Sequence, residues 1–141
     1  MLAITYSDDN RGSIQFRERR KQIIDFSGLR YGNITPTDCD GFIEYQNKAY
    51  VLFEIKYRDA KVPHGQSLAL TRSVDDYVSA GKKALLIIAQ HEVDDPNQDI
   101  NAAKCSVRDF YFKGKWHKPK DSITLKDAID KFITYFKEEI T

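Results

Sequence analysis

Apolar residues along this chain fall into short runs and alternating patterns that predict β-strands. The longest is the segment 49–57, Ala-Tyr-Val-Leu-Phe-Glu-Ile-Lys-Tyr, in which only Glu54 and Lys56 carry charge. The segment at about 40–46 is expected to form the preceding strand, and Gln46-Asn47-Lys48 joins the two. A three-residue hairpin loop at that point would place Asp40 opposite Glu54.

Three helices and two further strands are predicted from apolar spacing and from β-branched and aromatic content. The helices are expected at residues 13–26, at 66–80 and from 124 onward, and the strands at 84–89 and 105–112. Thr124 is expected to cap the last helix, with Asp127 at the capping-box position where Glu or Gln is usual. Gly81 is expected to end the middle helix.

These elements predict a single α/β domain over residues 1–141, with a mixed central β-sheet flanked by helices. A chain of 141 residues buries about two-thirds of its unfolded surface, so any bound metal is expected to be functional rather than structural. No apolar run approaches the ~20 residues of a membrane span, and the first residues lack a charged leader. We therefore expect a cytoplasmic protein with no membrane partner.

Charged residues inside the strand 49–57 need an explanation. Residues two apart in a strand share a face, so Glu54 and Lys56 point the same way. A buried strand carries such groups only when they are paired or hold a ligand. With Asp40 opposite, two carboxylates and a lysine meet on one patch of sheet, which suits a hard divalent cation. Asp38 has the same strand parity as Asp40 and competes with it for this role.

This arrangement resembles the motif of the PD-(D/E)XK nuclease superfamily, an acidic residue at the start of one strand and Glu-x-Lys on the next. Asp40 and Glu54-Ile55-Lys56 occupy the motif positions. The order of elements is also similar: a helix, three strands, a helix opened by Gly65-Gln66, and an apolar strand. The resemblance covers about residues 13–91. It implies a restriction-endonuclease-like core and a small nuclease of the phage, prophage or Holliday-junction-resolvase type.

The resemblance implies a metal site made of oxygen ligands. Asp40, Glu54 and the main-chain carbonyl of Ile55 would bind Mg²⁺ or Mn²⁺, and Asp40 is preferred over Asp38 because apolar residues follow it directly, as in the family. Lys56 would hold or deprotonate the attacking water.

Two further side chains have roles that the resemblance implies. Glu18 would be an additional carboxylate from the first helix, in contact with the metal or its water. Gln66, at the start of the second helix, would position water or phosphate. The histidines have no partners at metal-ligand spacing, so a zinc site is not expected.

The charge of the chain restricts how it can bind nucleic acid. The net charge is +1, with 22 basic and 21 acidic residues, so DNA binding needs a local basic patch. The basic residues that flank the motif in sequence are Arg17, Arg19, Arg20, Lys21, Arg58 and Lys61.

Two functions follow from these patterns. The first is Mg²⁺-dependent hydrolysis of duplex or branched DNA, with RNA left open as a substrate and a second copy of the chain as a partner, because cutting two strands needs two sites. The second is a non-catalytic nucleic-acid-binding or protein-interaction module that keeps the fold, with Asp40, Glu54 and Lys56 as a structural ion-pair network.

Overall fold

The computed structural model describes residues 21–140. Contacts divide the chain into two compact units, Met1–Pro36 and Thr37–Thr141. All the strands and helices that the structure describes belong to the second unit.

The helix predicted over residues 13–26 is wrong in its described part, because residues 21–26 form a turn followed by irregular chain. The main-chain N–H of Ser27 donates to Asp25 Oδ1 at 2.9 Å. Short polar side chains such as Asp offer the main chain local partners that compete with helical hydrogen bonds. Ile23 is also 92% exposed, so the apolar stripe that supported the prediction is not buried in its described part. Residues 13–20 lie outside the described residues.

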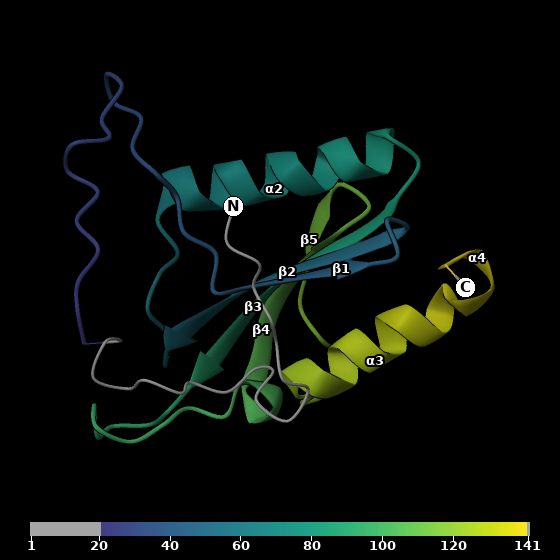
Figure 1. Cartoon of the computed structure of the whole chain (residues 1–141). Helices are drawn as coiled ribbons and strands as arrows, with labels where there is room; N and C mark the ends of the chain where they lie inside the picture. Colours follow the sequence, from purple (N-terminus) through teal and green to yellow (C-terminus); the bar gives the residue numbers. More distant parts are fainter. Residues whose placement is uncertain (1–20, 141) are drawn as a thin grey trace, which may run out of the picture. The chain divides into compact units, whose positions relative to one another are not determined.

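The second unit is built on a five-stranded sheet in the order β1-β2-β3-β4-β5 (Figure 1). The strands are β1 (Gly41–Tyr45), β2 (Ala49–Tyr57), β3 (Lys83–His91), β4 (Ser106–Phe112) and β5 (Lys115–His117). The helices are α2 (His64–Ser79), the 3₁₀ turn η2 (Ala102–Lys104), α3 (Leu125–Tyr135) and α4 (Lys137–Ile140). Strands β2 and β3 are parallel and the other neighbours are antiparallel. The predicted α/β fold with a mixed sheet flanked by helices is therefore confirmed.

Most predicted elements form close to their expected bounds. Strand β2 has the predicted bounds, and Thr124 caps α3 by accepting a hydrogen bond from the N–H of Asp127 at 3.2 Å. The predicted order differs in a further respect, because two strands rather than three lie between residue 21 and α2. No helix in the described part of the chain combines the length and apolar character needed to cross a membrane.

The hairpin β1–β2 has the predicted register. Gly41 pairs with Phe53 and Tyr45 pairs with Ala49, so Gln46-Asn47-Lys48 forms the connection. Gln46 and Asn47 adopt left-handed conformations, with φ of 52° and 57°, as a tight reversal between antiparallel strands requires. The same register continued by one residue places Asp40 opposite Glu54.

Helices cover the two faces of the sheet, α2 on one side and α3 on the other (Figure 1). Side chains alternate between these faces along each strand. Val51 and Ile87 belong to the core cluster that includes Phe132 of α3, whereas Leu52 and Leu86 belong to the cluster that includes Leu70 and Val74 of α2. By this alternation Glu54 and Lys56 lie on the face covered by α2, where its first turn begins.

Candidate metal centre

The candidate site lies where the β1–β2 hairpin ladder ends. Strand β1 begins at Gly41, so its main chain no longer pairs with Ile55. The carboxylate of Asp40 takes over this role, because Asp40 Oδ2 accepts a hydrogen bond from the N–H of Ile55 at 2.7 Å. In the opposite direction, the N–H of Asp40 donates to Glu54 Oε2 at 3.3 Å. These two bonds hold both carboxylates at one end of the hairpin.

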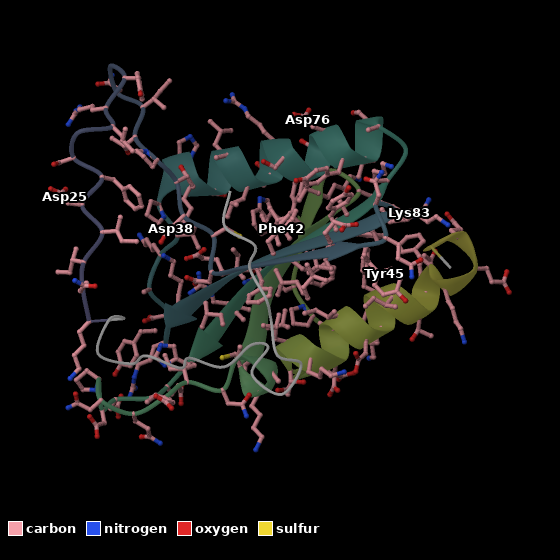
Figure 2. The ribbon with its side chains drawn as sticks, viewed as in Figure 1. Asp25, Asp38, Phe42, Tyr45, Asp76 and Lys83 are labelled. Carbon is pink, nitrogen blue, oxygen red and sulfur yellow. The ribbon has the colours of Figure 1, made fainter. Side chains whose placement is uncertain are left out.

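Asp38 completes a cluster of three carboxylates. Asp38, Asp40 and Glu54 each offer an oxygen atom, and these atoms all lie within 4.8 Å of one another. Figure 2 shows Asp38 close to the first turn of α2. There, Gln66 Nε2 donates to both the main-chain oxygen and Oδ1 of Asp38, each at 3.0 Å. The structure thus brings together both aspartates that competed for the metal-ligand role, together with the predicted residues Glu54 and Gln66.

Glu54 is the buried member of this cluster. Its exposed fraction is 2%, and Gln66 is buried beside it, whereas Asp38 and Asp40 are exposed. Burial, and then the neighbouring Asp40 carboxyl group, raise the pKa of Glu54 to about 7. The Asp40 N–H and the Gln66 side chain oppose this rise in pKa. A buried carboxyl group beside two other carboxylates is costly to ionise, and a bound cation would lower that cost.

Lys56 lies next to the buried carboxylate. Its Nζ is 3.7 Å from Glu54 Oε1, and its side chain is 21% exposed. The predicted placement of Glu54 and Lys56 on one face of β2 is therefore confirmed. An ammonium at this position can stabilise negative charge on a group that contacts the carboxylates.

The other atoms at the site favour oxygen ligands. The N–H and C=O of one residue in an antiparallel ladder point to the same neighbouring strand. The N–H of Ile55 points to Asp40, so the carbonyl of Ile55 points to the same edge of β2, the edge that pairs with β1. Cys39 lies between the two aspartates, but its Sγ donates to the carbonyl of Gly41 at 3.1 Å, and burial raises the pKa of its thiol. A protonated thiol is a poor metal ligand, so the available donor set is carboxylate and carbonyl oxygen, which suits Mg²⁺ or Mn²⁺.

Several predicted residues are not brought to this cluster by any described contact. Arg17, Glu18, Arg19 and Arg20 lie outside the described residues, and Lys21 and Lys61 are exposed. Arg58 directs its guanidinium elsewhere: Nη2 is 2.8 Å from Asp94 Oδ1, and Nε donates to the Tyr57 hydroxyl at 2.9 Å. Its phosphate-binding role would require Asp94 to release it.

Gly41 is a residue of this site that sequence reasoning did not single out. The ring of Phe53 lies across Gly41, and a Cβ atom built on Gly41 would stand 1.9 Å from Phe53 Cζ. The Asp-Gly pair at the start of a predicted strand was a signal for this close approach, since glycine in a strand often marks one. Gly41 thus lets Phe53 cross the hairpin directly beside Asp40.

We expect Gly41→Ala to lower the free energy of unfolding by about 1–3 kcal/mol, the usual cost of overpacking. The added methyl group must displace the Phe53 ring or the start of β1. Urea denaturation measures the change. Gly28→Ala is the control, because a methyl group at Gly28 would meet no atom within 4 Å. Equal stability of the two variants would contradict the expectation.

Comparison of the chain with protein-family models, with curated proteins and with solved structures finds no match. The geometry of the site is therefore the basis for inferring a function.

Proposed function

We propose that the chain is a Mg²⁺- or Mn²⁺-dependent nuclease that hydrolyses phosphodiester bonds in DNA, with a restriction-endonuclease-like core of the PD-(D/E)XK type. The observation that carries the proposal is the convergence of three carboxylates within 4.8 Å, one of them buried, with a lysine 3.7 Å from the buried one. Isolated surface carboxylates need no cation, but a buried carboxylate beside two others gains much from one.

The residues of the site divide the work of hydrolysis among them. Asp38, Asp40 and Glu54, with the carbonyl of Ile55, would hold the cation, and Gln66 would keep Asp38 in position. When bound, such a cation polarises the scissile phosphate and lowers the pKa of a bound water. Lys56 would hold the attacking water and stabilise the charge that develops on the phosphate.

The DNA backbone would be held by the basic residues that flank the motif. These are Arg17, Arg19, Arg20, Lys21, Arg58 and Lys61. Glu18, which lies among them in the sequence, would instead orient a metal-bound water. Binding through phosphates of this kind is independent of sequence and weakens as salt rises. A second copy of the chain would supply the second active site needed to cut both strands.

A second candidate function is a non-catalytic nucleic-acid-binding or protein-interaction module. The contacts of the carboxylates favour it. Asp40 accepts a hydrogen bond from the N–H of Ile55 at 2.7 Å, and Glu54 pairs with Lys56 at 3.7 Å, as in a purely structural network. In that case the carboxylates would need no cation.

The purified chain is expected to cleave duplex or branched DNA with Mg²⁺ or Mn²⁺ and to be inactive in EDTA. The same ions should raise its thermal midpoint, since a ligand that binds only the folded state stabilises it. Asp40→Asn is the test variant, and Asp130→Asn, on the exposed side of α3, is the control. A wild-type chain with neither cleavage nor an ion-dependent midpoint would support the module instead.

A further inference from the structure

A β-bulge in β4 sets one arginine apart from its neighbours. Ile88 pairs with Asp109 and Ala89 pairs with Val107, so Arg108 is an extra residue in β4. Bulges redirect a side chain and recur beside functional sites. Strand β4 is two strands away from the motif in the sheet, and the sequence pattern does not indicate a role for Arg108.

The redirected side chain reaches the connection between β2 and α2. Arg108 Nη1 donates to the carbonyl of Ala60 at 2.8 Å and to that of Arg58 at 3.4 Å. The Arg108 side chain is 21% exposed, and its Nε lies 3.5 Å from Asp109 Oδ2. Arg108 thus bonds main-chain atoms that lie about fifty residues before it in the chain.

The bonded segment contains a strained residue. Arg58 has a φ of 51°, a left-handed conformation that residues other than glycine adopt only where the surrounding structure holds them in it. The N–H of Arg58 donates to His91 at 2.8 Å and the N–H of Ala60 donates to Tyr57 at 3.1 Å. Arg108 donates to the carbonyls of the same two residues. The turn at residues 58–60 is therefore held through both its N–H groups and its carbonyl groups.

This turn joins two residues of the proposed site. Lys56 precedes the turn at the end of β2, and Gln66, which holds Asp38, follows it in the first turn of α2. A change in the turn would therefore move Lys56 and Gln66 relative to each other, although Arg108 forms its hydrogen bonds and its ion pair with Arg58, Ala60 and Asp109 and not with either of them in the described part of the chain.

We propose that Arg108 is a positioning residue, which fixes the Arg58 turn and thereby the relative placement of Lys56 and the α2 residue Gln66. This inference rests on the proposed nuclease function. The bulge would then serve to direct the Arg108 side chain to this turn. In a regularly paired strand, the side chain at this position would follow the alternation between the two faces of the sheet.

Arg108→Ala is expected to lower kcat by about 10- to 100-fold, as displacement of reacting groups by ~1 Å does, with KM and Mg²⁺ affinity near those of wild type. Arg108→Lys should recover part of kcat, because one ammonium can still reach a carbonyl. The control is Lys118→Ala, which also removes one positive charge. The Lys118 side chain pairs with Asp109 at 2.7 Å, as Arg108 does at a longer distance, but it is 78% exposed. Lys118→Ala should cleave as wild type does.

Amide hydrogen exchange supplies a readout that does not depend on cleavage. The N–H groups of Arg58 and Ala60 should exchange faster in Arg108→Ala and at the wild-type rate in Lys118→Ala. If Arg108→Ala does not fold, Arg108→Lys carries the test, with intermediate exchange and intermediate kcat expected.

The outcomes separate the two proposals. Unchanged exchange, or faster exchange with unchanged kcat in a wild type that does cleave, overturns the role of Arg108 and leaves the nuclease proposal standing. A wild-type chain that does not cleave overturns the nuclease proposal and, with it, the positioning role.

Discussion

Glu54→Gln is expected to reduce Mg²⁺-dependent cleavage by more than ~100-fold. Loss of a residue that only supports a metal ligand costs ~10- to 100-fold, and Glu54 is proposed to be a ligand itself. The same variant is expected to stabilise the metal-free protein at pH 8. Glutamine keeps the size of the side chain and an oxygen for the N–H of Asp40, but it carries no charge. The buried site then no longer contains a carboxylate that has to ionise.

The sign of this effect follows from the raised pKa of Glu54. Between its ordinary value of 4.5 and about 7, the folded protein retains a proton that the unfolded chain has released. The stability of the metal-free wild type should therefore fall as pH rises through this window. The loss amounts to at most about 3–4 kcal/mol, at ~1.36 kcal/mol for each pKa unit, whereas the variant lacks this dependence.

Thermal melts from pH 4 to pH 8 in EDTA, repeated with Mg²⁺, would measure both effects. Glu92→Gln is the control, because it removes the same charge from an exposed position and should retain the wild-type pH dependence. Mg²⁺ should stabilise the wild type at pH 8 and leave Glu54→Gln nearly unchanged. If Glu54→Gln proves less stable than the wild type at pH 8, the carboxylate belongs to a structural ion-pair network, as the second candidate function requires.

Lys56→Ala is expected to lower the cleavage rate by about 10²- to 10³-fold, the usual cost of removing one group that stabilises transition-state charge. Metal binding should persist, since the proposed oxygen ligands belong to the three carboxylates and to Ile55 rather than to Lys56. A Mg²⁺ titration followed by the thermal midpoint, alongside single-turnover cleavage, separates the two properties.

Two further variants sharpen this test. Lys56→Arg keeps a positive charge that cannot be removed near neutral pH, so it should retain part of the activity if the charge itself matters. Lys126→Ala, an exposed lysine on α3 paired with Asp130, is the control and should cleave normally. Full activity in Lys56→Ala would mean that Lys56 only extends along the sheet surface and that the proposed mechanism is wrong.

Local patterns in the sequence were sufficient to predict the hairpin that carries the site. A three-residue connection sets the register of β1 against β2, and the two-residue period of a strand then places Glu54 and Lys56 on one face. The cap at Thr124 was predictable for the same reason, because donor and acceptor are three residues apart. The strand pattern of β3 and the helical spacing of α2 also depend only on neighbouring residues.

Where local signals conflicted, sequence reasoning failed. The apolar residues near Ile23 have helical spacing, but the hydrogen bond between Ser27 and Asp25 favours non-helical chain, and residues 21–26 form a turn followed by irregular chain. Periodicity indicates a helix only when a partner covers the apolar stripe, and the exposed fraction of Ile23 is 92%.

The sequence by itself determined which residues could form a metal site, and the tertiary structure decided how they are held. Gln66 reaches Asp38 across 28 positions, and Arg108 reaches Ala60 across 48. Neither contact has a signature in spacing, because both depend on the path of the chain through α2 and on the bulge in β4. The raised pKa of Glu54 likewise arises chiefly from its burial in the folded chain, whose extent no local pattern encodes.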